Sequence, residues 1–455
     1  MSAVRKLKIE RITTSLERID YRTPMKFGGR VVADVTIADA QVELSTDDGR
    51  SAVGRGSMTM GNAWSWPSTS VPSSETLAAM IELFERTAED VADVTTGTDP
   101  FDLGAAVADS AHRRAEHLRL SCGLAEPMPR LAVSVAVSPI DAAIHDAFGR
   151  LLGRSSFACL DRETLGRDLG SLLDPEFAGL KLASFVSSRP APTLPLYHLV
   201  GALDPLDDGE VTKRIDDGLP ETLGEWIVQD GLDHLKIKLA GDDLEWDVAR
   251  VLKVDAVATR TWSAASLPDG VYSLDFNERC ADVGYVLEFL ERIRSERPSA
   301  YDRIQYLEQP THRDLAGPGR IPMHRAAALK PVVIDESLLD LESLRAAREL
   351  GYSGIALKAC KGQSGSLLMA AAAKHYGMFL CVQDLTCVGA SFLHSASLAA
   401  HIPGIAAIEG NGRQYCPKGN AAWTHSYPGM FAIRRGRVVS AELAGIGLGF
   451  VWPES

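Results

Sequence analysis

The stretch that decides the fold is "GLDHLKIKLAG" at residues 231–241. Its apolar and basic residues alternate, which is the two-residue period of a β-strand with one apolar face. Lys236 and Lys238 therefore stand side by side on the other face of that strand. Two ammonium groups so placed repel each other, and their burial is costly unless other charges compensate it. The strand therefore predicts a site in which the lysine pair has partners of opposite charge.

Short apolar strands of this kind recur from about residue 193 to the end of the chain, and amphipathic helical segments lie between most of them. The eight strands are TLPLYHLVG (193–201), LDHLKIKLA (232–240), VYSLDFNE (271–278), RIQYLEQP (303–310), PVVIDES (331–337), GIALKAC (354–360), MFLCVQD (378–384) and IAAIEGN (405–411). This alternation is typical of a parallel sheet. Closed into a (β/α) barrel, it needs about 200–250 residues, and an open doubly wound sheet is the alternative. No GxGxxG follows a strand and no GxxxxGK[ST] occurs, so a nucleotide-binding fold gains no support.

The first 150 residues have a different pattern and predict an α+β domain. Residues 32–57 contain β-rich runs with an Asp-Asp-Gly turn, which indicates a hairpin. Residues 154–192 are rich in Ser, Gly and Pro and predict a linker or a domain boundary before the barrel. Helices are expected over 74–95, 104–120 and 138–153.

Composition excludes several classes of protein. The 455 residues carry a formal charge of −13, which suits neither a phosphate backbone nor an anionic membrane. The start of the chain has no apolar signal core, and no stretch approaches the roughly 20 apolar residues of a transmembrane helix. The seven cysteines form no CxxC pair. We therefore expect reduced thiols in a cytoplasmic protein.

Three strands end with a carboxylate, namely Asp275, Glu308 and Asp335. In a parallel barrel all carboxyl ends of the strands face one mouth, where active sites lie. The three carboxylates would repel one another there unless a cation lay between them, and oxygen ligands suit Mg²⁺. Removing one of them, as in Asp275→Asn, should then leave the metal-free protein as stable as before or slightly more stable.

Lysines approach the same centre from two sides. Lys236 and Lys238 end the second strand, and Lys358 ends the sixth. Lys236 and the nearby cation disfavour the charged form of Lys238. A neutral lysine amine near pH 7 is a general base.

Together these motifs resemble one known family. They are "KIK", "DFN", "LEQP", "IDES" and "LKACKGQSG" on successive strands, preceded by the helix "SPIDAAIHDAFGRLLG". The set is similar to the mandelate racemase/muconate-lactonizing enzyme family of the enolase superfamily, and within it to the muconate-lactonizing subgroup. The resemblance is good over about 130–410 and loose over the N-terminal region.

The resemblance implies an α/β fold, a modified TIM barrel (β/α)7β under an N-terminal α+β capping domain. The capping domain would span 1–150 and be completed by about 420–455, and the barrel would span 190–420. The family reaction is removal of a proton alpha to a carboxylate, which gives an enediolate stabilised by an essential Mg²⁺. Carried over by position, the metal ligands are Asp275, Glu308 and Asp335.

The resemblance also assigns the proton chemistry. Lys238 and Lys358 are acid/base groups on opposite faces of the substrate, and Lys236 tunes Lys238 or contacts the substrate carboxylate. Asn277, Asp384 and Glu409 are candidate substrate contacts. One departure concerns the sixth strand, which the family often follows with Gly-Gly. This chain has "KGQSG" there, so Lys361 is a second candidate base.

Other positions leave alternatives open. Trp64 and Trp66, on a Gly/Ser-rich loop expected over 54–68, either pack on the barrel or line the pocket. Arg22 and Lys26 either contact an anion or are solvated. His394 lies past the seventh strand and is expected to pack rather than to act as a base. Residues 201–230 form a long insertion after the first barrel strand.

The function expected from these residues is racemisation or epimerisation of a small carboxylic acid by a homo-oligomer. Dehydration of an acid sugar and cycloisomerisation are alternatives, because both would use the same metal and lysines. The alternative from another functional class is a metal-binding barrel that catalyses no reaction and acts as a structural or partner protein.

Overall fold

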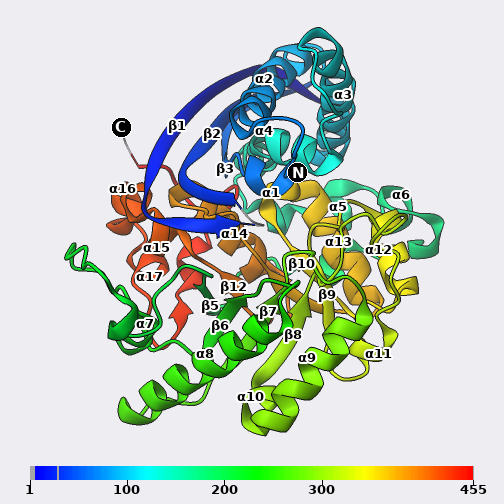
Figure 1. Ribbon diagram of the computed structural model, residues 1–455. Coiled ribbons are helices and arrows are strands. Elements are labelled where there is room, and N and C mark those ends of the chain that lie inside the picture. Colours follow the sequence, from blue (N-terminus) through cyan, green and yellow to red (C-terminus); the bar gives the residue numbers. More distant parts are fainter. Residues whose placement is uncertain (1–5, 28–29, 454–455) are drawn as a thin grey trace.

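The computed structural model describes residues 6–27 and 30–453, and its centre is a closed parallel barrel (Figure 1). The barrel strands are β5 (Leu194–Val200), β6 (His234–Lys238), β7 (Val271–Asp275), β8 (Ile304–Glu308), β9 (Val332–Ile334), β10 (Gly354–Leu357), β11 (Phe379–Val382) and β12 (Ile408–Glu409). β12 pairs with β5 through Ile408 and Leu196, which closes the sheet. The barrel predicted from the strand pattern is confirmed, and the open sheet is excluded. A short strand, β13 (Arg437–Val438), runs antiparallel to β5.

Helices surround the barrel and alternate with its strands, as the sequence pattern predicts. They are α7 (Leu223–Asp230), α8 (Leu244–Ala264), α9 (Val283–Glu296), α10 (Pro298–Arg303), α11 (His324–Ala327), α12 (Leu341–Glu349), α13 (Gln363–His375) and α14 (Gly389–His401). Side chains fill the barrel interior, among them Tyr197, Tyr306 and Cys381. The barrel is therefore a packed core with its chemistry confined to the mouth.

An antiparallel sheet and three long helices lie to one side of the barrel (Figure 1). The strands are β1 (Leu7–Phe27), β2 (Arg30–Thr46), β3 (Ser51–Thr59) and β4 (Thr96–Gly97), and the helices are α2 (Ser73–Val91), α3 (Pro100–Ser121) and α4 (Arg130–Leu151). The predicted Asp-Asp-Gly turn joins β2 to β3. The long strand β1 was not expected, because most of its residues are polar and only a few are buried.

Helix α4 lies between the sheet and the barrel. It begins eight residues before the predicted start and contains Pro139. β3 approaches it so closely that a Cβ on Gly54 would lie 2.2 Å from the Ala143 carbonyl oxygen. Within the described part of the chain, α4 is the one helix long and apolar enough to cross a membrane, and 94% of its apolar window is buried inside the protein.

Two expectations about irregular segments are wrong. Residues 154–192 are not an open linker, because Leu160, Leu169 and Phe177 are buried. The expected loop at 54–68 contains the end of β3 and the short helix α1 (Asn62–Ser65). The remaining helices are α5 (Arg162–Leu165), α6 (Leu169–Leu172), α15 (Gly412–Tyr415), α16 (Ala421–Thr424) and α17 (Pro428–Phe431), and 3₁₀ turns lie at Ser156–Cys159, Pro175–Phe177, Leu182–Ser184, Asp208–Glu210, Ala359–Lys361, Pro417–Asn420 and Ser440–Leu443.

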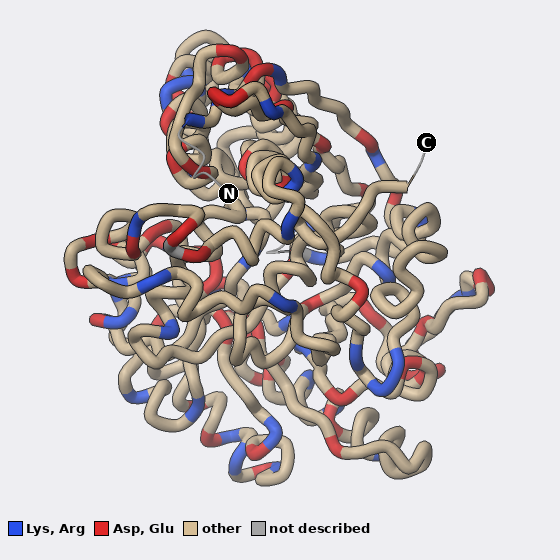
Figure 2. The backbone as a smooth tube through the Cα atoms, turned by 180° about the vertical axis from the view of Figure 1, so that it is seen from behind, with Lys and Arg blue, Asp and Glu red and all other residues tan. Residues whose placement is uncertain are grey.

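The segment between β5 and α7 projects from the barrel in both views (Figures 1 and 2). Figure 2 shows acidic and basic residues interspersed along the chain. The division into domains at 1–150, 190–420 and 420–455 stays a prediction.

Candidate active site

The charged residues that end the barrel strands meet at one mouth. The ladder between β6 and β7 places Lys238 opposite Asp275, and the next ladder places Asp275 opposite Glu308. Asp335 directly follows β9, and Lys358 directly follows β10. All of these side chains are buried, and the most exposed, Lys238, is 7% exposed. The predicted set is therefore brought together in a site shielded from water.

Lys236 lies at the centre of this cluster. Its Nζ donates hydrogen bonds to Glu308 Oε1 at 2.8 Å, Glu409 Oε2 at 3.0 Å and Gln383 Oε1 at 2.5 Å, and it lies 3.4 Å from Asp275 Oδ2. Burial by itself would lower the pKa of Lys236, but the surrounding carboxylates outweigh burial and hold that pKa well above its usual value. Lys236 is therefore a fixed cation in this arrangement.

Lys238 is held by two groups of the neighbouring strand end. Its Nζ donates to Asp275 Oδ2 and lies 3.3 Å from Asn277 Oδ1. Burial would raise the pKa of Asp275, but Lys238 and Lys236 outweigh it, and the pKa falls below its usual range. Asn277 has φ +52°, a left-handed backbone, and its side-chain amide donates to the Leu239 carbonyl at 2.8 Å. Asn277 thus positions Lys238 in this structure.

Asp335 binds both candidate lysines that follow β10. Lys358 Nζ lies 2.7 Å from Asp335 Oδ2, and Lys361 Nζ lies 3.2 Å from Oδ1 and 2.5 Å from the carbonyl oxygen of the same residue. Burial opposes ionisation of Asp335, but the two lysines outweigh it and lower its pKa. Burial would lower the pKa of Lys358, but the charge of Asp335 outweighs burial and raises that pKa.

The other two candidate substrate contacts have internal partners. Glu409 binds Lys236, and its second oxygen accepts from Asn411 Nδ2 at 2.9 Å. Asp384 accepts from the backbone N–H groups of Thr386 at 3.2 Å and Asn411 at 3.4 Å. Burial raises the pKa of Asp384 well above its usual value, and the charge of Glu409 adds to this effect. Both carboxyl groups lie at the predicted mouth.

Three residues at the mouth were not assigned a role from the sequence, namely Glu278, Arg313 and Glu336. Trp64, for which packing and pocket lining were both considered, contacts two of them. Trp64 Nε1 donates to Glu336 Oε1 at 2.7 Å, and its ring centroid lies 3.9 Å from Lys358 Nζ. Arg313 Nη2 donates to the Trp64 carbonyl oxygen at 3.0 Å and Arg313 Nε to Glu278 Oε1 at 2.7 Å. Burial, reinforced by the charge of Glu336, raises the pKa of Glu278 to about 8. Glu278 directly follows the "DFN" motif and Glu336 lies within "IDES", which was the one available signal for them.

The three carboxylates suit Mg²⁺ by their chemistry. They are oxygen donors on adjacent strand ends, and Glu308 Oε2 is buried without a hydrogen-bond partner. Their present positions are not those of a metal shell: among residues 6–27 and 30–453, no three Asp, Glu, His or Cys side chains are arranged to hold an ion. Lysine ammonium groups lie between them instead. These ammonium groups are cations between the carboxylates, as the repulsion argument requires. Burial, reinforced by the charges of Asp275 and Asp335, still raises the pKa of Glu308 well above its usual value.

A cavity of about 480 Å³ opens beside Lys238 and Asn277. Leu203 and Trp246 form part of its wall, and Lys26 from β1 lines it as well. This size is in the range of small-molecule sites. Of the two residues considered as anion contacts, Lys26 therefore lines the same cavity as Lys238.

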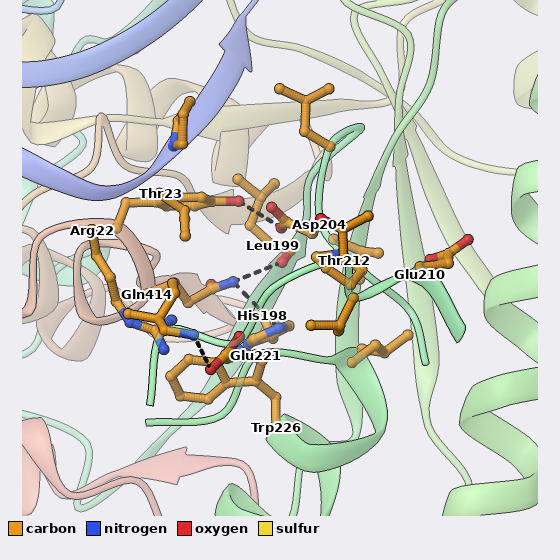
Figure 3. A pocket seen from close by; sticks show the side chains of 18 of the residues that line it. Arg22, Thr23, His198, Leu199, Asp204, Glu210, Thr212, Glu221, Trp226 and Gln414 are labelled. Carbon is orange, nitrogen blue, oxygen red and sulfur yellow. Dashed lines mark hydrogen bonds between the residues drawn. The ribbon is translucent and has the colours of Figure 1, made fainter. Parts of the chain in front are cut away.

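Arg22 lies elsewhere. It lines a separate pocket of about 300 Å³ beside β5, where His198 and Gln414 are its neighbours (Figure 3). Its guanidinium binds Asp217 of the projecting segment at 2.5 Å and 2.8 Å. His394 is on α14, as expected for a packing residue, and its Nε2 lies 2.9 Å from Gln363 Oε1.

Comparison with known proteins agrees with this geometry. Residues 219–454 match the family model described as enolase C-terminal domain-like. The chain belongs to the mandelate racemase/muconate-lactonizing enzyme family of the enolase superfamily. This family assignment covers the strands that carry the lysines and carboxylates. No curated protein sequence matches this member of the enolase superfamily.

Solved structures of the superfamily share its fold over nearly the whole chain. The dipeptide epimerase from Enterococcus faecalis is 17% identical with a TM-score of 0.63, and the alignment covers 97% of this chain and 99% of the epimerase. The L-Ala-D/L-Glu epimerase from Bacillus subtilis is 18% identical with a TM-score of 0.63, covering 98% and 100%. The muconate lactonizing enzyme from Pseudomonas fluorescens is 18% identical with a TM-score of 0.60, covering 98% and 96%. At this identity the likeness shows the modified TIM barrel with its capping domain.

Proposed function

We propose that this protein catalyses Mg²⁺-dependent removal of a proton alpha to a carboxylate, as a racemase or epimerase of a small acid. One observation carries the proposal: Lys238 and Lys358 end β6 and β10, which lie on opposite sides of the closed barrel. Each lysine is bound to its own carboxylate, Asp275 or Asp335. A planar intermediate between them would present one face to each lysine.

In the proposed reaction Asp275, Glu308 and Asp335 would hold Mg²⁺. When bound, the metal supplies Lewis-acid stabilisation of negative charge on the substrate carboxylate. The unpartnered Glu308 Oε2 supports this assignment. Magnesium also accompanies the dipeptide epimerase and the Bradyrhizobium enolase in their structures.

Residues of the chain would share the proton transfer. Lys238 would take or deliver the alpha proton on one face, and Lys358 on the other. Lys236 would contribute fixed positive charge toward the developing enediolate, because its carboxylate partners keep it protonated. Asn277 would orient Lys238, and Asp384 and Glu409 would contact the substrate.

Dehydration of an acid sugar and cycloisomerisation would use the same residues and remain the alternative reactions. We also propose that the protein is a cytoplasmic homo-oligomer that acts on a small carboxylate rather than on nucleic acid or a membrane. The cytoplasmic location is supported by the cysteines, all seven of which are free thiols.

The test is a screen in D₂O with MgCl₂, followed by NMR. The library contains mandelate, sugar acids, N-acyl amino acids and dipeptides such as L-Leu-L-Tyr, a ligand of the epimerase structure. We expect deuterium at the alpha carbon of both configurations without a keto acid. EDTA should abolish exchange and Mg²⁺ should restore it. Keto-acid formation would favour dehydration, and full turnover after chelation would overturn the metal assignment.

The lysine variants decide the two-base mechanism. Lys358→Ala should lose alpha-proton exchange from one enantiomer by about 10²–10⁴-fold and keep exchange from the other, and Lys238→Ala should do the reverse. Loss from both enantiomers in either variant would mean that one lysine does all the proton transfer. That result would favour dehydration or cycloisomerisation over racemisation.

A further inference from the structure

Trp64 connects the N-terminal segment to the barrel mouth. It lies on α1, which follows β3, yet its polar partners come from the barrel. Glu336 follows β9, Arg313 follows β8 and Lys358 follows β10. The Trp64 side chain is buried, with 6% of its surface exposed. The indole contacts Glu336 and Lys358, and Arg313 binds the backbone carbonyl, so Trp64 is more constrained than packing alone requires.

The ring of Trp64 lies against the ammonium of Lys358. Lys358 Nζ is 3.9 Å from the ring centroid, whereas Lys361 Nζ is 5.7 Å away. Attraction between a cation and an aromatic face is strongest for Trp and increases when water is excluded. Both Trp64 and Lys358 are buried, so these conditions hold.

Trp64 is held at its side chain and at its backbone. The indole N–H donates to Glu336 Oε1 at 2.7 Å, and the backbone carbonyl accepts from Arg313 at 3.0 Å. Arg313 is itself bound to both carboxylate oxygens of Glu278, at 2.7 Å and 2.9 Å. The ring cannot turn away from Lys358 without breaking the hydrogen bond to Glu336.

The other partner of Lys358 is Asp335, at 2.7 Å. We propose that Trp64 is a positioning residue that keeps Lys358 at the barrel mouth when Asp335 is engaged by a cation. This inference rests on the proposed function, in which Asp335 is a metal ligand. A carboxylate that also binds a divalent ion attracts the lysine ammonium less strongly. An aromatic face neither binds that ion nor exchanges protons. Lys238, on the opposite side, is held by Asp275 and Asn277 instead.

The test uses NMR of the full-length protein with lysine labelled with ¹³C at Cε, with and without Mg²⁺ alone. The ring current of Trp64 should place the Lys358 methylene signal upfield of ordinary lysine signals, and Lys358→Arg identifies the signal by its loss. Trp64→Phe keeps an aromatic face and should retain part of the upfield shift. Trp64→Leu should lose the shift. In the wild type the signal should stay upfield when Mg²⁺ is added.

Trp66→Leu is the matched control, because Trp66 is also buried but its indole binds Glu126 at 2.6 Å. It should leave the Lys358 signal in place. The inference is overturned if the Lys358 signal is not upfield in the wild type, or if Trp64→Phe and Trp64→Leu do not move it. It is also overturned if Mg²⁺ moves the Lys236 and Lys238 signals and shifts the Lys358 signal to the ordinary lysine position. If Mg²⁺ moves none of the three signals, the metal assignment fails and the positioning role fails with it. A Trp64→Leu protein that does not fold leaves the wild-type and Trp64→Phe spectra to decide.

Discussion

At the scale of single residues, the barrel mouth is a set of matched opposite charges. Lys236 binds Glu308, Lys238 binds Asp275, and Lys358 binds Asp335. We therefore expect removal of a carboxylate to have the opposite effect on stability from the one that repulsion among the carboxylates alone would predict. Each buried carboxylate stabilises a buried ammonium, and taking one away leaves a charge without its partner.

Asp275→Asn should accordingly destabilise the metal-free protein. Asp275 is almost fully buried and contacts both Lys238 and Lys236, and breaking such a pair costs about 3–5 kcal/mol. Urea unfolding in EDTA measures the difference. Asp34→Asn is the control, because Asp34 pairs with the exposed Arg18 and should cost less than about 1 kcal/mol. Equal stability of Asp275→Asn and the wild type would show that the lysines find other compensation.

At the scale of elements, two long-range contacts fix the position of the N-terminal sheet. Gly56 of β3 lies against α4, where an added Cβ would be 2.1 Å from the Pro139 carbonyl oxygen. Arg22 of β1 reaches the segment that projects between β5 and α7, and it also donates to the Leu219 and Pro220 carbonyls at 3.3 Å and 3.2 Å. The first contact fixes how closely the sheet packs, and the second anchors an otherwise projecting segment.

Arg22→Met should release that projecting segment. Its guanidinium is 8% exposed and makes a two-pronged bond to Asp217, so the variant loses several hydrogen bonds at once. Trypsin should then cut faster after Lys213 or Arg214, which lie on the segment, as followed by mass spectrometry. Arg18→Met, which removes an exposed pair on the same strand, should leave the cleavage rate unchanged. Equal cleavage of all three proteins would mean that other contacts anchor the segment.

At the scale of the whole molecule, buried histidines make the fold sensitive to acid. Burial lowers the pKa of His401 to about 4 and that of His394 to about 3, although His401 also donates to the Ser397 carbonyl. An unfolded histidine has a pKa of about 6.5. The unfolded chain therefore binds more protons below that value, so stability is complete above pH 6.5 and is lost as pH falls toward 4.

His401→Gln should reduce this loss. Between pH 7 and pH 5 we expect the wild type to lose about 2 kcal/mol more than the variant, since a neutral amide does not titrate. The free energy of urea unfolding at the two pH values measures this. His425 is exposed, and His425→Gln should behave like the wild type. A wild-type loss that His401→Gln does not reduce would assign the acid sensitivity to other groups.

The barrel and its mouth could be predicted because short, local sequence patterns indicate them. A short apolar run between amphipathic helical segments identifies each strand, and a charged residue at its end lies at the carboxyl end of the barrel, as Asp275, Glu308 and Lys358 show. β1 could not be found this way, because its polar residues are held by pairing with β2 rather than by burial of an apolar face. Residues 154–192 were misjudged because composition does not show which side chains another segment will cover.

By itself, then, the sequence determined a parallel barrel, the strand ends that carry its chemistry and the family to which they belong. Only the tertiary structure decided which lysine binds which carboxylate, and that Trp64 lies against Lys358. The physical reason is sequence distance. Trp64 and Glu336 are 272 residues apart, and no local period relates side chains that meet only when a separate sheet packs on the barrel.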